Sequence, residues 1–310
     1  MLKGDGSMKV SCFGSLNIDL VYDVPHFVRK GETLASRSLH VYSGGKGLNQ
    51  SIALARAGME VHHAGAIGDD GAFLLEQLED AGVLTGHVER LEGVKTGHAI
   101  IQRDDEGDNC ILLYGGANQR ITRQQIDRTL ASFSPGDALV LQNEISELPY
   151  LVERARAVGM TIALNPSPMD DALRPLLRSV DWLLLNEVEA AQILGAAGGE
   201  DPEAMARGLR SLCPETKILL TLGAQGSLYV DGEICLRAEA LSVEPVDTTA
   251  AGDTYTGFFL AGVLSGRDTH WAMRYASVAA GIAVTRPGAA PSIPTKGEVL
   301  ARMGEGWHDH

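Results

Sequence analysis

The 310-residue sequence predicts an α/β fold in which a mostly parallel central sheet carries a second, smaller β-sheet. Short apolar runs alternate with longer helical patterns from about residue 45 to the C-terminus, which is typical of repeated β-α units. Several of these runs end in polar residues. Two segments, 18–43 and 96–114, lack this rhythm and have the pattern of extended chain. We therefore expect a layered α/β core with a small β-sheet standing off it.

Six short apolar runs are the expected strands of the main sheet. They occupy residues 9–15, 61–68, 138–143, 161–166, 182–186 and 217–223. Polar groups end four of them, namely Gln142-Asn143-Glu144, Asn165-Pro166-Ser167, Asn186-Glu187 and Thr221-Leu222-Gly223. Ligands of open α/β sheets bind beyond the carboxyl ends of the strands. The sequence therefore predicts a binding site at that edge of the sheet.

The extended segments predict a small sheet with two possible roles. Residues 96–114 have the pattern of a hairpin, in which TGHAIIQR and CILLY flank the polar turn DDEGDN. Such a sheet suits a lid over a strand-end site, and its open face also favours a homodimer. The expected division is a core at 8–17, 44–95 and 119–305, a β lid at 18–43 and 96–118, and flexible tails at 1–7 and 306–310.

Charge and cysteine content argue against several classes of protein. The formal net charge of -14 disfavours a protein that follows a nucleic-acid backbone, because such proteins need clustered Lys and Arg. The four cysteines are widely spaced and favour free thiols in a reducing compartment. The N-terminal MLKGDGSM lacks the apolar core of a signal peptide, and no apolar run reaches the ~18 residues of a spanning helix. We expect a cytoplasmic protein with no nucleic-acid or membrane partner.

The stretch DTTAAGDTYTGFF, residues 247–259, predicts a buried helix that begins at small residues. From Gly252 onward the apolar residues recur at helical spacing, which places Asp253 in the first turn. A carboxylate there suits the positive end of the helix dipole without any ligand. Small residues at 250–252 equally suit a helix start that binds a phosphate, with Asp253 beside it as a base. This stretch alone leaves both interpretations open.

Three further motifs also have a structural and a functional interpretation. SGGKGLNQ, residues 43–50, is either a glycine turn before a helix or a close approach to a ligand, and its spacing is not that of a Walker A loop. GSLNID, 14–19, puts Asn17 and Asp19 on one face of a strand end, which is either simply solvated or provides two acceptors for hydroxyls. NEVE, 186–189, suits either a capped helix or a site for hydrated Mg²⁺. No Ser-His-Asp order or dinucleotide motif supports a hydrolase or dehydrogenase.

Eight motifs together indicate a family. In chain order they are GSLNID, SGGKGLNQ, QNE, NPSP, NEVE, TLGAQG, DTTAAGD and RPGAAPS. This series resembles the PfkB family of carbohydrate kinases, and within it the ribokinase branch, over residues 8–300. The resemblance implies a three-layer αβα sandwich with a mostly parallel central sheet and a β-sheet lid. The stretch PHFVRKGE at 25–32 departs from the Pro-x-x-Gly-Glu spacing of the family and falls in the expected lid. The resemblance therefore specifies the reaction more closely than it specifies the sugar.

The same resemblance implies roles for individual residues. Asp253 would be the base, with an anion hole made by the N–H groups of Ala250, Ala251, Gly252 and Asp253. The implied sugar contacts are Asn17, Asp19, Gly44, Gly45, Lys46, Asn49, Glu144 and Asp253. The implied nucleotide contacts are Asn186, Thr221, Gly223 and Gly226, with Glu189 positioning Mg²⁺ through water. A monovalent cation, K⁺, is implied mostly on main-chain oxygens at Asp247, Thr249, Ala283, Arg286, Gly288 and Ser292.

The implied function is an ATP-dependent sugar kinase that converts D-ribose to ribose 5-phosphate. Carboxylates and amides suit a polyol because each binds neighbouring hydroxyls. Related kinases acting on fructose, a deoxy sugar, a sugar acid or a nucleoside remain as alternatives, although the absence of an aromatic cluster in 10–50 disfavours a nucleoside. A non-catalytic sugar sensor is a third possibility, which the intact Asp253 and the glycines at 44–47 disfavour.

Overall fold

A nine-stranded sheet forms the centre of the molecule in the computed structural model, which describes residues 8–196 and 201–304. Its strands are β1 (Lys9–Phe13), β4 (Glu60–Ile67), β5 (Leu84–Arg90), β8 (Ala138–Gln142), β9 (Thr161–Asn165), β10 (Trp182–Asn186), β11 (Lys217–Thr221), β12 (Ser227–Asp231) and β13 (Ile234–Ala238). Their order is β13-β12-β11-β10-β9-β8-β1-β4-β5. All pairs are parallel except β11-β12 and β12-β13. The prediction of a mostly parallel sheet is confirmed.

The six predicted strands are all present, and β5, β12 and β13 are strands that the apolar runs did not reveal. The predicted strands include β8, which is buried at every position and therefore reads as a continuous apolar run. β5 and β13 are edge strands with mostly exposed or half-buried residues, so they carry no such run. Exposure, rather than a lack of pairing, explains why these two were missed.

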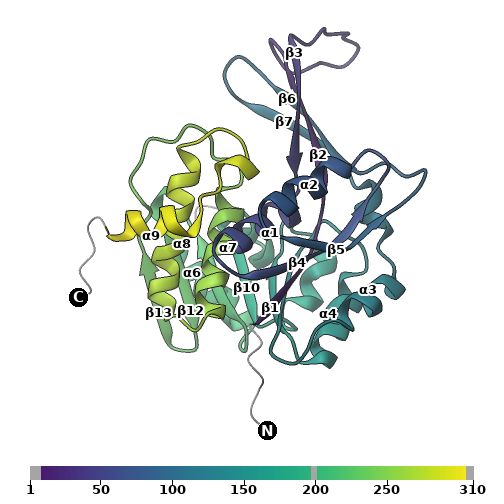
Figure 1. Cartoon of the computed structure of the whole chain (residues 1–310). Helices are drawn as coiled ribbons and strands as arrows, with labels where there is room; N and C mark the ends of the chain where they lie inside the picture. The colour runs from purple at the N-terminus through teal and green to yellow at the C-terminus, as the bar shows by residue number, and fades with distance from the viewer. Residues whose placement is uncertain (1–7, 197–200, 305–310) are drawn as a thin grey trace.

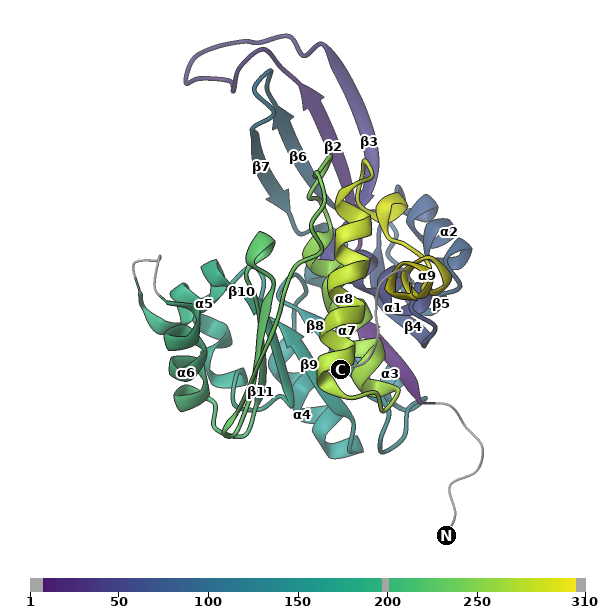
Figure 2. The same ribbon diagram turned by 90° about the vertical axis from the view of Figure 1, so that its left-hand side faces the viewer.

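Helices cover both faces of the sheet. They are α1 (Lys46–Arg56), α2 (Ala72–Asp80), α3 (Arg123–Leu130), α4 (Leu148–Val158), α5 (Glu187–Leu194), α6 (Pro202–Leu212), α7 (Ala251–Leu264), α8 (Thr269–Val284) and α9 (Lys296–Gly304). Buried residues of α1, α2, α7, α8 and α9 form one apolar cluster, and those of α3 to α6 form the other. Strand β8 contributes to both clusters, because its side chains alternate between the two faces of the sheet. Ala138 and Val140 belong to the first cluster, and Leu139 and Leu141 to the second. Figures 1 and 2 show the resulting three layers, as expected.

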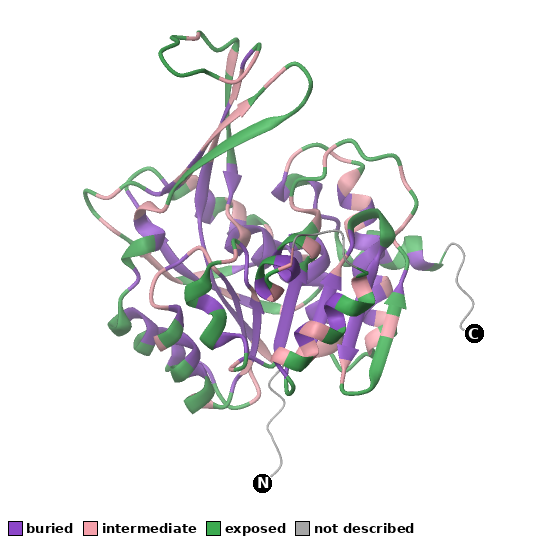
Figure 3. Ribbon diagram, turned by 180° about the vertical axis from the view of Figure 1, so that it is seen from behind, coloured by how far each residue is buried: buried purple, intermediate pink, exposed green. Residues whose placement is uncertain are grey.

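A separate four-stranded sheet projects from the body of the molecule (Figure 1). It contains β2 (Asn17–Asp23), β3 (Ser38–Gly44), β6 (Gly97–Arg103) and β7 (Asn109–Tyr114), in the order β3-β2-β6-β7. The predicted hairpin over 96–114 is confirmed as the antiparallel pair β6-β7. Every residue of β7 is exposed, as Figure 3 shows for much of this outer sheet. We refer to this sheet as the lid sheet; its role is a proposal below.

Helices α1 and α7 pack unusually closely. A Cβ on Gly257 of α7 would lie 2.4 Å from Cβ of Ala53 and 2.9 Å from the backbone N of Leu54, both in α1. Only a glycine permits this approach of the two helix backbones. The contact lies one turn beyond Asp253 in α7 and one turn beyond Asn49 in α1. It therefore holds the N-terminal ends of both helices side by side at the carboxyl edge of the sheet.

Within residues 8–196 and 201–304, no helix is long and apolar enough to cross a membrane. The four cysteines are unbridged; Cys12 and Cys213 are buried, whereas Cys110 and Cys235 are exposed. The expectation of free thiols is confirmed. The tails expected at 1–7 and 306–310 lie outside the described residues.

Candidate active site

The carboxylate of Asp253 lies where the N-termini of α1 and α7 meet. It is 8% exposed and accepts two hydrogen bonds from side-chain amides of α1. Nδ2 of Asn49 donates to one carboxylate oxygen at 3.1 Å, and Nε2 of Gln50 donates to the other at 2.9 Å. Asp253 stands in the first turn of α7, as the sequence predicts. The two amides fix the orientation of this carboxylate without neutralising it.

The backbone that begins α7 leaves donors unused. Ala250, the residue before the helix, has φ 59° and ψ 10°, a left-handed conformation that costs a non-glycine residue about 1–2 kcal/mol. The N–H of Ala251 donates to the carbonyl of Thr248 at 3.2 Å, and that of Thr254 donates to Ala250 at 2.8 Å. In the part of the chain that the structure describes, the N–H groups of Gly252 and Asp253 between them have no hydrogen-bond partner. Such a helix start is an anion-binding site.

Two adjoining cavities meet at this helix start. The larger, of about 430 Å³, is walled by apolar groups such as Leu241, Val243 and Val284. The smaller, of about 260 Å³, is more polar and contains Lys46, Glu189 and Asp253. The residues that line both cavities are Asn186, Thr221, Thr248, Ala251 and Gly252. Together they offer an apolar compartment that continues into a charged one, and Gly223 and Gly226 line the apolar part.

Asn186 and Glu189 form a reciprocal cap on α5. Oδ1 of Asn186 accepts from the N–H of Glu189, and Oε2 of Glu189 accepts from the N–H of Asn186, each at 2.9 Å. The structural interpretation of the NEVE motif is therefore confirmed. Both residues also line the smaller cavity, so the cap presents a buried carboxylate to it. One motif serves the fold and supplies a charge to the cavity.

Lys46 lies among three carboxylates. Burial on its own would lower the pKa of the Lys46 ammonium, but the charges of Asp253, Glu144 and Glu189 hold that pKa above its ordinary value. The ammonium is therefore positively charged at neutral pH. It lines the smaller cavity, whose other members include the start of α7. A cation and a helix N-terminus thus face the same space.

Asp19 of β2 lies against the backbone of β3. A Cβ on Gly44 would lie 2.1 Å from the Asp19 carboxylate, so a larger residue there would displace the Asp19 side chain. Burial, and then the charge of Glu144, raise the pKa of Asp19 to about 6. Glu144 in turn accepts from the N–H of Lys46 at 3.0 Å and from the Ser15 hydroxyl. Burial raises the pKa of Glu144 against these hydrogen bonds. The carboxylates predicted from three separate motifs therefore belong to one cluster.

Two further predicted contacts are placed by local constraints. Gly45 precedes α1 with φ 94°, a conformation that only glycine adopts without strain. Asn17 is buried, and its Oδ1 accepts from Nδ2 of Asn118 at 2.8 Å. Asn49 retains a buried side-chain oxygen with no partner among the described residues. A buried acceptor of this kind is free to accept a hydrogen bond from water or from a bound hydroxyl.

The six residues of the predicted cation site lie in two segments that Asp247 joins, one before α7 and one from the last turn of α8 to Ser292. One carboxylate oxygen of Asp247 accepts from the N–H of Thr249 at 2.9 Å, and the other accepts from the N–H of Gly288 at 2.8 Å. The Arg286 side chain is paired with Glu298 at 2.6 Å, which turns its charge away to α9. Ala283 and Ser292, at the two ends of the second of these segments, are both buried. Across residues 8–196 and 201–304, no three His, Cys, Asp or Glu side chains gather as metal ligands, so a cation here would depend on main-chain oxygens.

Several residues of the site were not predicted. Gln50 holds Asp253, and its Oε1 accepts from Nε2 of Gln142 at 2.6 Å. Oδ1 of Asn118 accepts a hydrogen bond from the N–H of Leu16 at 3.0 Å and thereby fixes the start of β2. Asn165 accepts weakly from Gln50 at 3.3 Å and lines the smaller cavity. Gln50 and Gln142 do occur within quoted motifs, but nothing in a single sequence distinguishes a buried amide from a surface one.

The profile of the pfkB family carbohydrate kinases matches residues 7–296. The chain belongs to this family. The Haemophilus influenzae ribokinase is 33% identical over 297 residues, covering 94% of this chain and 97% of the relative. The Salmonella typhi deoxyribokinase is 30% identical over 298 residues, covering 93% of this chain and 96% of the relative. The structure of Arabidopsis thaliana ribokinase complexed with ribose and ATP matches with a TM-score of 0.86 at 27% identity, covering 96% of this chain and 98% of that one. The predicted family and fold are confirmed, and the chain is a carbohydrate kinase.

Replacing Gln50 with Leu should slow this carbohydrate kinase by misplacing Asp253. A hydrogen bond to a charged group contributes about 1.5–3 kcal/mol, so we expect kcat to fall roughly 10- to 150-fold with little change in the KM of the nucleotide. Steady-state kinetics measures both. Gln125→Leu is the matched control, because Gln125 is also buried and donates to Gly65, away from Asp253. An unchanged kcat in Gln50→Leu would show that Asn49 alone positions the carboxylate.

Proposed function

We propose that this carbohydrate kinase transfers the γ-phosphoryl group of ATP to D-ribose and produces ribose 5-phosphate. The observation that carries the proposal is the junction of α1 and α7. There the Asp253 carboxylate, held by Asn49 and Gln50, borders the same cavity as the unpaired N–H groups that begin α7. A base for a hydroxyl and a cradle for a phosphoryl group are thus adjacent. The similarity to ribokinases over almost the whole chain supports ribose as the acceptor.

Each part of the junction has a task in phosphoryl transfer. Asp253 accepts the proton of the attacking hydroxyl, because its buried carboxylate is fixed and has free lone pairs. The N–H groups of Gly252 and Asp253 stabilise the charge on the transferred group, and Lys46 adds a positive charge from the opposite helix. These donors are in place before the substrates bind, so their reorganisation does not add to the barrier.

The two adjoining cavities suit the two halves of ATP. The larger, apolar cavity accommodates the adenosine between the loop of Gly223 and Gly226 and the α8 residues Gly281 and Val284. The smaller cavity accommodates the phosphates, with Asn186 and Thr221 at the junction. Bound Mg²⁺ would neutralise phosphate charge. The buried Glu189 carboxylate, which the α5 cap fixes, is the group that fits a hydrated Mg²⁺.

The sugar would bind beside Asp253, under the lid sheet. Acceptors for its hydroxyls come from Asn17, Asp19, Glu144 and the unpartnered oxygen of Asn49. Gly44 and Gly45 let the backbone come close to the sugar. A sugar that lacks one of these hydroxyls leaves a buried acceptor unpaired, which is how such a site discriminates.

A deoxy sugar is the second candidate substrate, because a deoxyribokinase is nearly as similar to this chain as a ribokinase is. The junction of α1 and α7 serves either substrate equally. The choice between them depends on whether an acceptor such as Asp19 or Asn17 faces the hydroxyl that the deoxy sugar lacks. A non-catalytic sensor is disfavoured, because an oriented Asp253 beside unpaired N–H groups has no use in binding alone.

The proposed assembly is a homodimer through the lid sheet. Its outer strands expose large apolar side chains, and this is unusual outside an interface. They are Leu39, Val41 and Tyr42 on β3 and Ile111, Leu112, Leu113 and Tyr114 on β7. A second copy would cover them. The proposed compartment is the cytoplasm, which free thiols support, and the proposed partners are the sugar and ATP, with no nucleic acid or membrane.

Asp253→Asn tests the proposed base. Removing the proton acceptor should lower kcat by roughly 10²- to 10⁴-fold, because general base catalysis contributes about that much. Coupled release of ADP would be measured with ribose, 2-deoxyribose, fructose and adenosine. Asp231→Asn, on β12, is the control and should be as active as the wild type. Ribose-dependent turnover that survives in Asp253→Asn would refute the base, and turnover on another sugar alone would refute ribose.

The pKa of Asp19 predicts a pH profile. Because this carboxyl has a pKa of about 6 instead of 3.8, its ionised form is lost at a higher pH than usual. We expect kcat/KM for the sugar to fall as pH drops through about 6, since a protonated Asp19 accepts hydroxyl hydrogen bonds poorly. Asp19→Asn should remove this limb and lower the plateau. Asp23→Asn, on the same strand, should retain the limb, because hydrogen bonds from Ser38 and Arg103 lower the pKa of Asp23. A limb unchanged in Asp19→Asn would contradict the assignment.

A monovalent cation beside Asp247 would order the loop that leads into α7. The implied donor set of one carboxylate and neutral main-chain oxygens suits a single positive charge such as K⁺, and the Arg286 side chain pairs with Glu298 instead of occupying the site. We expect kcat to fall several-fold when tetramethylammonium replaces K⁺, and K⁺ to raise the melting temperature. Asp247→Asn should require more K⁺ for half-maximal rate. Equal rates and melting temperatures in the two salts would exclude the site.

A further inference from the structure

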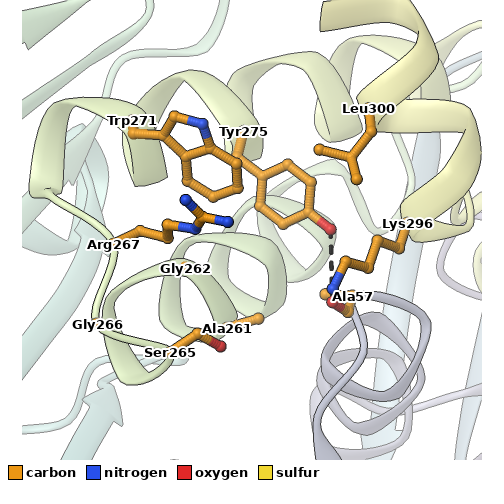
Figure 4. Close-up of a pocket in the computed structure, with 10 residues that line it drawn as sticks. All are labelled: Ala57, Ala261, Gly262, Ser265, Gly266, Arg267, Trp271, Tyr275, Lys296 and Leu300. Atoms are coloured by element: carbon orange, nitrogen blue, oxygen red, sulfur yellow. Dashed lines mark hydrogen bonds between the residues drawn. The ribbon is translucent and has the colours of Figure 1, made fainter.

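A separate pocket lies at the far ends of α1 and α7. It has a volume of about 320 Å³ and is bounded by the last turns of both helices, the first turns of α8 and the start of α9. Its lining residues, drawn in Figure 4, are Ala57, Ala261, Gly262, Ser265, Gly266, Arg267, Trp271, Tyr275, Lys296 and Leu300. Along α7, Gly262 is about 14 Å from Asp253 at ~1.5 Å per residue. The pocket is therefore distinct from the proposed active site.

Two cationic side chains enter this pocket, and no carboxylate lines it. Arg267 and Lys296 reach in from opposite sides in Figure 4. Among the described residues, neither side chain has an acidic group within ion-pair distance. Their arrangement favours an anionic ligand.

Two stacked aromatic rings form the wall between the cations. Trp271 and Tyr275 stack with ring centroids 4.8 Å apart, and the Arg267 guanidinium lies 5.1 Å from the centroid of Trp271. The buried Tyr275 hydroxyl donates to the Ala57 carbonyl at 3.5 Å, the dashed line in Figure 4. Small residues, including Ala261, form the opposite side and leave the space open. The Arg267 guanidinium thus lies over an aromatic ring, and its N–H groups remain available.

We propose that this pocket binds a phosphate group, either free or as a small phosphate monoester. A guanidinium matches two phosphate oxygens at once, and a lysine adds a point charge on the other side. The volume is at the lower limit for small-molecule sites, so it fits a phosphate with only a few further atoms. The alternative is that both cations only complement the carbonyl ends of α1 and α7, in which case no ligand binds.

The indole of Trp271 provides a local reporter. A protein with Trp182→Phe and Trp307→Phe retains Trp271 as its sole tryptophan. We expect its fluorescence to change saturably with inorganic phosphate and with glycerol 3-phosphate, but not with glycerol or with NaCl at equal ionic strength. Arg267→Gln and Lys296→Gln should each weaken this binding by roughly tenfold or more, as loss of a charge-assisted hydrogen bond does. Arg90→Gln/Arg207→Gln removes two surface charges elsewhere and should bind like the parent.

The outcomes separate the possibilities. Tighter binding of glycerol 3-phosphate than of phosphate assigns the site to an ester, and equal or weaker binding assigns it to free phosphate. No saturable change, or equal binding in Arg267→Gln and the parent, overturns the proposal. If the single-tryptophan protein does not fold, the shift in melting temperature with each anion is compared between the wild type and Arg267→Gln/Lys296→Gln. An equal shift in both again overturns it. None of these readouts depends on turnover, so the proposed function is tested separately.

Discussion

The hydrogen bonds from Asn49 and Gln50 to Asp253 are the contact on which the site depends. They connect the first turns of two helices that are far apart in the sequence. The close approach at Gly257 makes these bonds possible, because a larger residue there would push α7 away from α1. The carboxylate is thereby fixed beside a helix N-terminus whose dipole favours its charge. The orientation of the proposed base and its placement beside the unpaired N–H groups both depend on this packing contact.

The cluster of charges around Lys46 is costly to the fold. Burying ionised groups is unfavourable unless they are paired, and here several carboxylates share one ammonium. The raised pKa values of Asp19 and Glu144 record this cost. Hydrogen bonds from Ser15 and the Lys46 N–H offset part of it at Glu144. The cost therefore falls on the residues that we propose to bind the sugar and the phosphates, whose hydroxyls and charges would supply further partners.

The sequence predicts this architecture well where burial is uniform. Strands such as β8 are apolar up to their last residue, and the polar residues at and after their ends mark the edge that carries the proposed site. The edge strands β5 and β13 were not predicted, because exposed strands contain no continuous apolar run. The residues that position others, such as Gln142 and Asn118, could not be identified, since their role depends on contacts between distant segments. The pocket of Arg267 and Lys296 has the same origin, because tertiary packing alone brings its walls together.

Helix α1 also links the sugar motif to the predicted cation loop. Its N-terminus supplies Lys46, Asn49 and Gln50, whereas Arg56 in its last turn donates to the carbonyls of Ala290 and Ile293. Those carbonyls lie on either side of Ser292, shortly before α9. A rigid helix transmits a displacement at one end to the other, since its backbone hydrogen bonds resist bending. The base proposed at Asp253 and the segment proposed to hold the cation therefore contact opposite ends of α1, and the pocket of Arg267 and Lys296 adjoins the second of these ends.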